Sequence, residues 1–265
     1  MPPDAYFTAQ LSDRRLIRVT GEDATSFLQN VITNDMGGVS AAEMRYACLL
    51  TPQGQYLHDF FILSDGAGGY FLDVEAVRAE DLLRRFGIFR LRSRVSFSYA
   101  PDMRVYAALR PGRGYPDPRR AGLGYRIYTA EILPSEPVQR YYDFCIARGV
   151  PCGSLTIKPE KETMADVNLD LLNAVAWDKG CFIGQEVAAR MHHRGLSKRR
   201  LFVVSGSGLA PGVLRLNGVD VGELRQVNGA KDMGLAVIKL AAVSDKSVEL
   251  ATEQGTPARL SETSV

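Results

Sequence analysis

Cys181 lies in the segment whose residue types and spacing most strongly indicate a reactive or ligand-binding site. Gly180 and Gly184 flank it, and Lys179 stands two positions before it. A helix is expected to open at Gln185, and the two glycines permit a tight loop that holds the thiol near the free N–H groups of the helix start. The lysine and the positive helix end both favour the thiolate over the thiol. Such a thiolate could attack an electrophile, ligate a metal or trap an intermediate, whereas the plainer alternative is a small residue packed in a tight loop.

The helix expected from Gln185 has a charge pattern of its own. Glu186 is favoured near the positive helix end, and Arg190 follows at the i+4 spacing of an ion pair that would hold the helix start in place. Basic residues continue over 194–200, and a second basic cluster covers 84–94. Because the whole chain carries a net charge of only +2, these clusters indicate attraction for a small polyanion, and bulk binding of nucleic acid is not expected.

The remaining cysteines, Cys48, Cys145 and Cys152, are predicted to be reduced packing residues, because no C-x-x-C pair occurs. A metal site needs three or four converging donors, and the sequence shows no such set, so no metal is expected. The glycine-rich fingerprints of dinucleotide and nucleotide sites are missing, as is the serine elbow of the hydrolases.

The elements that must position the loop are short strands mixed with helices over the first two-thirds of the chain. Strands are predicted over 15–20, 44–50, 56–63, 70–74, 95–99, 105–109 and 124–128, helices over 24–34, 76–86 and 138–148, a loop over 111–122, and a loop with a short helix over 155–175. From residue 200, short β-branched runs at 201–204, 213–216, 219–224, 235–240 and 247–250 predict a small antiparallel barrel. We therefore expect an α+β fold in two domains, 1–199 and 200–265.

The composition and the N-terminal residues indicate where in the cell the protein is found. The chain has 265 residues, of which 46% are hydrophobic and 23% are charged, as in ordinary globular proteins. No apolar run approaches the roughly 18 residues of a membrane span. The segment Met1-Pro2-Pro3-Asp4 has neither the basic head nor the apolar stretch of a secretory signal. The sequence therefore predicts a cytoplasmic protein that does not enter a membrane.

Several motifs, in chain order, resemble the YgfZ family, the folate-binding, iron–sulfur maturation relatives of the glycine cleavage T-protein. Residues 179–186 are similar to that family's K-G-C-[YF]-x-G-Q-E signature, and Asn168-Leu169-Asp170 precedes them as the family's N-L-D does. The other matching elements are the opening at 21–35, L-T-P-Q-G at 50–54, D-P-R at 117–119 and L-G-Y-R at 123–126. The resemblance covers residues 21 to about 200.

This resemblance implies a T-protein-like fold, with a folate-binding α/β body of mixed or antiparallel sheets around a central cavity and a small C-terminal antiparallel β-barrel. It implies that tetrahydrofolate or another reduced folate binds in the body, and that the protein assists assembly or repair of iron–sulfur clusters in client enzymes or works with assembly proteins. Asn34 and Asp59 are candidates for the pterin edges and Arg126 for a carboxylate, although Asn34 could instead cap a helix. The signature residues carried over are Cys181 and Lys179 as the catalytic candidates, and Gly180, Gly184, Gln185, Glu186 and Arg190 as the loop.

The alternative function is folate-dependent aminomethyl transfer. T-proteins have an adjacent acidic pair where this chain has His58-Asp59, and the family's L-P-x-E before N-L-D is replaced here by Thr163-Met164-Ala165-Asp166. A third class, an RNA-associated module, is disfavoured because no aromatic recognition motif accompanies the basic segments. The sequence leaves open whether the loop cysteine would contact a cluster, a client thiol or a one-carbon unit.

Overall fold

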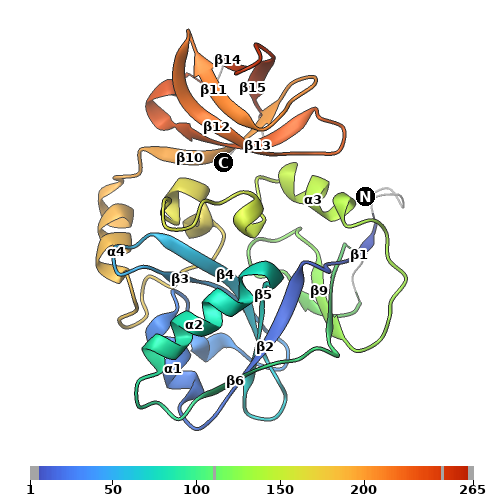
Figure 1. Ribbon diagram of the computed structural model, residues 1–265, viewed down its shortest axis with the longest axis vertical. Helices are drawn as coiled ribbons and strands as arrows, with labels where there is room; N and C mark the ends of the chain where they lie inside the picture. The colour runs from blue at the N-terminus through green and yellow to red at the C-terminus, as the bar shows by residue number, and fades with distance from the viewer. Residues whose placement is uncertain (1–5, 110–111, 246–247, 262–265) are drawn as a thin grey trace. The chain divides into compact units, whose positions relative to one another are not determined.

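The computed structural model describes residues 6–109, 112–245 and 248–261. Its contacts divide the chain into two compact units. Figure 1 colours the chain by residue number, from blue at the N-terminus to red at the C-terminus. The first unit contains the residues up to Val138 together with Asp170–Val187, and the second contains Gln139–Leu169 and the residues from Ala188 on. The signature loop thus belongs to the first unit, although it follows a segment of the second. The predicted domain division at residue 199 stays a prediction.

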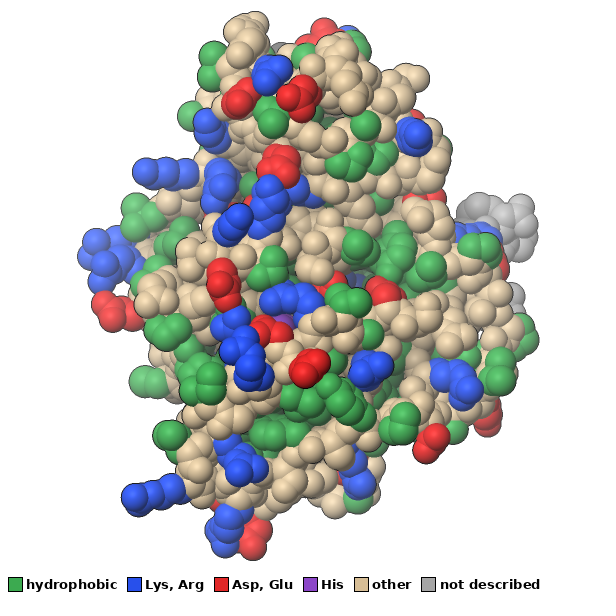
Figure 2. All heavy atoms as spheres, in the orientation of Figure 1, with side chains coloured by type: hydrophobic (Ala, Val, Ile, Leu, Met, Phe, Trp, Pro, Cys, Tyr) green, Lys and Arg blue, Asp and Glu red, His purple; other side chains and the backbone are tan. Residues whose placement is uncertain are grey.

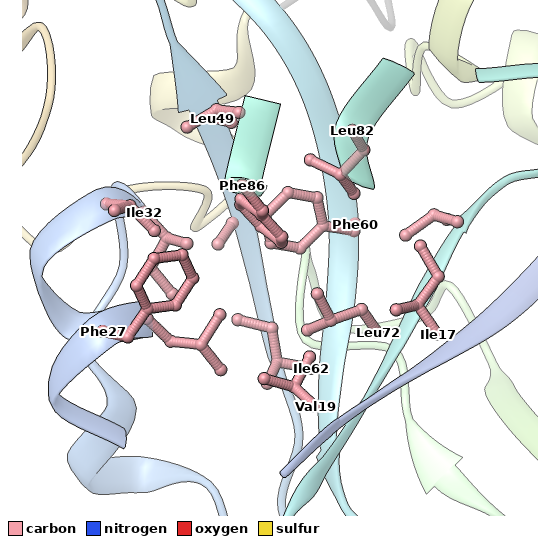
Figure 3. Close-up of a cluster of buried hydrophobic side chains, with 14 of the residues drawn as sticks. Ile17, Val19, Phe27, Ile32, Leu49, Phe60, Ile62, Leu72, Leu82 and Phe86 are labelled. Atoms are coloured by element: carbon pink, nitrogen blue, oxygen red, sulfur yellow. The ribbon is translucent and has the colours of Figure 1, made fainter. Parts of the chain in front are cut away.

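The first unit is built on a five-stranded antiparallel sheet with the order β3-β4-β5-β2-β6. Its strands are β2 (Arg14–Thr20), β3 (Arg45–Leu50), β4 (Tyr56–Ser64), β5 (Tyr70–Glu75) and β6 (Ser96–Tyr99). Helices α1 (Ala24–Val31) and α2 (Ala79–Arg90) pack their apolar faces on the sheet. Figure 3 shows Phe86 of α2 beside Phe60 of β4, with Phe27 of α1 in the same cluster, and the rings of Phe27 and Phe86 meet edge to face with centroids 5.5 Å apart. This cluster is the main hydrophobic core of the unit.

Side-chain alternation along β4 separates an apolar face from a polar one. Phe60 and Ile62 lie in the core beneath the helices, because successive side chains of a strand point to opposite faces. His58 has the same parity and contacts α2. Asp59 and Phe61 point to the other face, where polar side chains are buried. His58 and Asp59 therefore lie on opposite sides of the sheet, although they are neighbours in the sequence.

A second, four-stranded antiparallel sheet completes the first unit, with the order β1-β7-β9-β8. Its strands are β1 (Thr8–Gln10), β7 (Arg104–Ala108), β8 (Tyr115–Pro116) and β9 (Tyr125–Thr129). Arg126 and Tyr128 of β9 both reach Asp73 of β5. The two sheets are thus joined through buried polar side chains on the face of the large sheet that the helices leave uncovered.

The second unit contains a closed antiparallel barrel with the strand order β10-β13-β12-β11-β14-β15, and pairing of β10 with β15 closes it. The strands are β10 (Arg199–Ser205), β11 (Gly212–Leu216), β12 (Val219–Val227), β13 (Met233–Lys239), β14 (Glu249–Thr252) and β15 (Pro257–Leu260). Closure removes the unpaired strand edges that an open sheet would present. The unit also holds α3 (Gln139–Ile146), and α4 (Gln185–Arg194) begins in the first unit and continues into the second.

The structure confirms the predicted α+β fold and its C-terminal antiparallel barrel. The segment 155–175 was predicted to be a loop with a short helix, and 3₁₀ turns stand in place of that helix, at Gly153–Leu155, Ala165–Val167 and Leu169–Leu171. Other 3₁₀ turns are Met36–Gly38, Ala76–Arg78 and Leu240–Ala242. Residues 1–4, 111, 247 and 262–265, on which parts of the predicted N-terminus, loop, strand and barrel fell, lie outside the described residues. Within the described residues, no helix combines the length and apolarity needed to span a membrane.

Candidate functional site

The signature loop begins at Lys179, which is fixed to the end of α1. The Lys179 side chain is buried, and its Nζ donates to the backbone carbonyl oxygens of Gln29, Ile32 and Asn34 at 2.6, 2.8 and 2.9 Å. A cation at the C-terminal end of a helix is also favoured by the helix dipole. Burial lowers the pKa of Lys179 from 10.5 to about 8, against the attraction of Asp35. At neutral pH the ammonium still dominates and supplies one proton to each carbonyl. The Lys179 ammonium, which was expected to lie beside the Cys181 thiol, is therefore bound to the carbonyl oxygens at the end of α1.

The chain just before the loop is joined to the residues that follow α1. Thr33 Oγ1 donates to the carbonyl oxygen of Ala174 at 2.5 Å, and the backbone N–H of Ala176 donates to the carbonyl oxygen of Thr33 at 3.1 Å. The Asn34 side chain donates to the carbonyl oxygens of Tyr46 and Asn173, each at 2.7 Å, and its Oδ1 accepts from the N–H of Asp35. Asn34 therefore ties three backbone segments together, and both protons of its amide are used in doing so.

The loop ends at Gly184, which interlocks with the turn between β3 and β4. Gly184 has φ +79°, and a Cβ built on it would lie 2.4 Å from the carbonyl oxygen of Thr51 and 3.1 Å from the Cα of Gly54. Gly54, at φ +77°, packs in turn against Val187 and the carbonyl oxygen of Gly184. The predicted need for glycine is confirmed at Gly184. It is wrong at Gly180, where an added Cβ meets nothing within 4 Å and φ is not positive.

Cys181 is exposed between these two anchors. Cys48 and Cys145 are buried and Cys152 is partly buried, so Cys181 is the most accessible of the four cysteines, all of which fall within the described residues. Burial raises the pKa of the Cys48 thiol, and the nearby Asp59 charge raises it further. Among the described residues, no group of three or more His, Cys, Asp or Glu side chains is arranged to hold a metal ion. The loop can thus offer one accessible thiol on a backbone that is fixed at both ends.

Helix α4 begins at Gln185, as predicted. The N–H of Phe182 donates to Gln185 Oε1 at 3.3 Å, and the N–H of Gln185 donates to the carbonyl oxygen of Phe182 at 3.2 Å, so the loop turns directly into the helix. Glu186 and Arg190 are both exposed on α4, and the ion pair expected between them stays a prediction.

A buried polar cluster occupies the other face of the large sheet. Asp59 accepts from the hydroxyl of Tyr46 at 2.8 Å on one carboxylate oxygen and from the hydroxyl of Tyr56 on the other. All three side chains are buried. Burial raises the pKa of both tyrosines, and the Asp59 charge raises it further, so the phenols remain protonated donors.

The second carboxylate of this cluster is Asp73, which is fully buried. Arg14 Nε donates to it at 2.7 Å, Arg126 donates at 2.8 Å and the hydroxyl of Tyr128 donates at 3.0 Å. Burial alone would lower the pKa of Arg14, but the charges of Asp73, Asp59 and Asp13 and the hydrogen bond to Asp73 together outweigh it and hold that pKa above its ordinary value. Asp73 is thus a shared acceptor for both sheets.

Arginines surround one aromatic ring in this cluster. The guanidinium carbon of Arg126 lies 3.8 Å from the centroid of the Phe61 ring and that of Arg119 lies 5.1 Å from it, both within cation–π range. Arg119 is held by Asp117 through two side-chain hydrogen bonds of 3.0 and 2.7 Å. Burial raises the pKa of Asp117, but the charge and hydrogen bonds of Arg119 outweigh this effect and lower it overall. The polar cluster therefore balances its charges internally.

His58 belongs to a separate contact on the helix side of the sheet. Its Nε2 lies 2.8 Å from Asp81 of α2, which also accepts from Arg84 and Arg85. Burial lowers the pKa of His58 from 6.5 to about 4, and the nearby Arg78 charge lowers it further. His58 is therefore neutral at physiological pH and ties β4 to α2.

All the predicted site residues except Arg190 belong to the first unit, where they fall into two groups. The signature residues and Asn34 come together around the loop, whereas Asp59 and Arg126 lie in the buried polar cluster. Sequence reasoning assigned no role to Arg14 or Asp73. An aspartate inside the apolar strand 70–74 was the available signal, because a buried carboxylate needs partners.

This fold is that of an aminomethyltransferase of the glycine cleavage system. The model of the GCVT N-terminal domain matches residues 9–90. The crystal structure of glycine cleavage system aminomethyltransferase T from Bartonella henselae superposes with a TM-score of 0.77, covering 96% of this chain and 84% of that chain at 17% sequence identity. Likeness at this identity establishes the fold.

Sequence relatives identify the family. The mitochondrial iron-sulfur cluster assembly factor IBA57 of Homo sapiens is 31% identical, over 88% of this chain and 78% of its own length. The mitochondrial IBA57 homolog of Pyricularia oryzae is 30% identical, over 91% of this chain and 73% of its own length. The chain belongs to the IBA57 family of iron–sulfur cluster assembly factors. The predicted resemblance to the YgfZ family is confirmed as far as the superfamily that includes the IBA57 family, the YgfZ family and the T-proteins. Membership in the YgfZ family itself is not shown.

These relatives also correct one prediction. The N-terminal residues were taken to indicate a cytoplasmic protein, but the matching assembly factors from human, mouse and fungi are named as mitochondrial. The cytoplasmic location is therefore wrong. The argument failed because it tested only for a secretory signal, and other destinations do not require one.

Proposed function

We propose that this protein takes part in the maturation of iron–sulfur clusters and that Cys181 is the residue that meets the cluster or its carrier. The observation that carries the proposal is the exposed thiol on a loop held at one end by Lys179 and at the other by Gly184. Membership in the IBA57 family supports it, because the relatives are named as iron-sulfur cluster assembly factors. The clients would be iron–sulfur enzymes or other assembly proteins.

Cluster chemistry suits this geometry. Iron–sulfur clusters are held by cysteine thiolates, usually four for each cluster. Cys48 and Cys145 are buried, so a partner protein would supply further thiolates while Cys181 supplies one. A fixed backbone on both sides of the thiol keeps the entropic cost of forming such a shared contact low. The cluster is then the cargo of the reaction.

The test is a complementation assay in cells that lack the protein, scored by the activity of an iron–sulfur enzyme. Cys181→Ser should abolish rescue, whereas Cys152→Ser, which changes a partly buried thiol elsewhere, should rescue like the wild type. Both variants should accumulate to the same level and unfold at the same denaturant concentration. Full rescue by Cys181→Ser would remove the basis for the proposal.

We further propose that a reduced folate such as tetrahydrofolate binds in the first unit, as the resemblance to the YgfZ family implies. The donor set fits such a group in part. A carboxylate has about four lone-pair sites, and Asp59 uses two for tyrosine hydroxyls, so it keeps capacity for the amino and imino protons of a pterin. Asn34 and Arg126 already donate to protein acceptors, and we assign them to the wall that supports the site. When bound, a reduced folate supplies a carrier for one-carbon units.

Calorimetric titration with tetrahydrofolate tests this part separately from the role of the thiol. Asp59→Asn should weaken binding at least about tenfold, the equivalent of one charged hydrogen bond. Asp65→Asn is the matched control, since Asp65 is also a buried carboxylate but lies in the β4–β5 turn. Cys181→Ser should bind folate normally. Absence of folate binding in the wild type would refute the folate proposal and leave the cluster proposal intact.

Aminomethyl transfer is the weaker alternative. His58 stands where T-proteins have an acidic residue, and its contact with Asp81 holds it on the helix side of the sheet, away from Asp59. An adjacent pair acting on one substrate would need both side chains on the same side.

A further inference from the structure

The outer face of α2 exposes large apolar side chains that the fold does not use. Ile88 is 61% exposed, and Leu91, immediately after the helix, is 86% exposed. The opposite face of α2 packs on the hydrophobic core, where Leu82 and Phe86 are buried. Leu91 also borders an open hollow of about 730 Å³, lined by Asp23, Leu91, Arg92 and Ser93. The segment therefore keeps an apolar surface in water after folding is complete.

Leu91 is held in a backbone conformation that leucine disfavours. It follows α2 with φ 47° and ψ −110°, a positive-φ conformation that glycine adopts far more readily than other residues. A side chain with a Cβ is strained there, and burial does not compensate because the side chain is exposed. The exposed Leu91 therefore costs stability, and backbone strain of this kind clusters at ligand-contacting and switch regions.

The basic residues around these apolar side chains are all arginines. Residues 76–95 contain six arginines, no lysine and two acidic residues, so this segment carries +4 while the whole chain carries only +2. Arg84 lies four residues before Ile88 and therefore on the same helix face. Within the described part of the chain, Arg90 and Arg92 form no ion pair. Figure 2 shows basic and hydrophobic side chains next to one another on the surface over α2.

We propose that the outer face of α2 and the residues that follow it, with Arg84, Ile88, Arg90, Leu91 and Arg92, form a docking surface for an acidic amphipathic segment of a partner protein. Aliphatic side chains of that segment would cover Ile88 and Leu91. Its carboxylates would pair with the guanidinium groups, which bind carboxylates in two-pronged geometry. This surface is distinct from Cys181, and the proposal does not depend on the function of the loop.

Three features favour a protein over an anionic membrane. Arginine is enriched and lysine depleted at protein interfaces. The guanidinium group of Arg84 is held in place by Asp81, which suits pairing with discrete carboxylates. The acidic residues Glu22, Asp23 and Asp81 lie among the arginines as ion-pair partners, and they would be repelled by a continuous anionic surface.

The test uses a fluorescent 18-residue helical peptide with leucines along one face and glutamates on both flanks, measured by anisotropy. Binding should be saturable and should weaken with added salt. Ile88→Ser with Leu91→Ser, and separately Arg90→Glu with Arg92→Glu, should each weaken it at least about tenfold, the loss expected for central anchor residues. A peptide with lysines in place of the glutamates should bind the charge-reversed variant and not the wild type. Ile132→Ser, which changes an isoleucine that is 77% exposed elsewhere in the unit, is the control and should bind normally.

Leu91→Gly separates a docking role from a structural one. Because glycine adopts the Leu91 conformation without strain, this variant should unfold at a higher denaturant concentration than the wild type and yet bind the peptide more weakly. Lower stability in Leu91→Gly, or unchanged peptide binding in the serine variant, would overturn the proposal. So would absence of saturable peptide binding, equal dependence on these residues for binding phosphatidylglycerol vesicles, or a dimer of this chain that Leu91→Ser dissociates.

Discussion

Replacing Lys179 by methionine removes the contact that anchors the start of the signature loop. Methionine has nearly the length of the lysine stem but no proton to donate, so the carbonyl oxygens of Gln29, Ile32 and Asn34 lose their shared donor. All three carbonyls lie within or just beyond the last turn of α1. The change should therefore loosen both the end of α1 and the loop that carries Cys181.

The size of the effect follows from two opposing terms. Three hydrogen bonds from a charged donor contribute about 5–9 kcal/mol, at about 1.5–3 kcal/mol each. Burying the ammonium opposes them. Its pKa falls from 10.5 to about 8, which corresponds to about 3 kcal/mol at 1.36 kcal/mol per pKa unit. We expect Lys179→Met to lower the free energy of unfolding by the difference, about 2–6 kcal/mol, a large part of the stability of a typical domain.

Guanidinium chloride unfolding measures this change, and the rate of alkylation of Cys181 reports on the loop. The control is Lys158→Met, because Lys158 forms an exposed ion pair with Glu223 and should change stability by no more than about 1 kcal/mol. In Lys179→Met the midpoint should fall and the proteolytic susceptibility of residues 173–184 should rise.

Two results would refute this reasoning. One is a midpoint for Lys179→Met within experimental error of the Lys158→Met control. The other is a destabilised Lys179→Met protein in which the loop keeps wild-type protection from protease, because the lysine would then stabilise α1 without fixing the loop.

Three further predictions concern the loop and the sheet. Gly184→Ala should cost about 2 kcal/mol or more in chemical unfolding, because its Cβ would meet a backbone carbonyl at positive φ; Gly180→Ala should stay within about 0.5 kcal/mol of the wild type, and equal effects would contradict the interlock. Alkylation at neutral pH, read by mass spectrometry, should label Cys181 first and Cys48 only on unfolding; early labelling of Cys48 would contradict its burial. Because the pKa of His58 is about 4 when folded and 6.5 when unfolded, its contribution is complete above pH 6.5 and is lost as the pH falls toward 4, by up to about 3 kcal/mol. His58→Gln should flatten that part of the stability–pH curve, and an unchanged slope would rule out His58 as its source.

The sequence by itself determined the local features of this protein. Apolar spacing located α1 and α2, and β-branched runs separated by turn residues located the barrel, because both patterns follow from the repeat of a single element. The K-G-C signature singled out Cys181 as the candidate functional thiol, and the helix opening at Gln185 was predicted correctly. These conclusions needed only neighbours within a few residues.

Tertiary structure decided what each site residue touches. Lys179 finds its acceptors 145–150 residues earlier in the chain, and Gly184 needs its missing side chain because of a turn at 51–54. No local pattern records such pairings. Tertiary packing also decided what lies on each face of β4. His58 and Asp59 are neighbours in the sequence, at the position where T-proteins have an acidic pair, but a strand turns successive side chains to opposite sides. Only packing of α2 on one side and the second sheet on the other assigns His58 to a helix contact and Asp59 to the buried polar cluster.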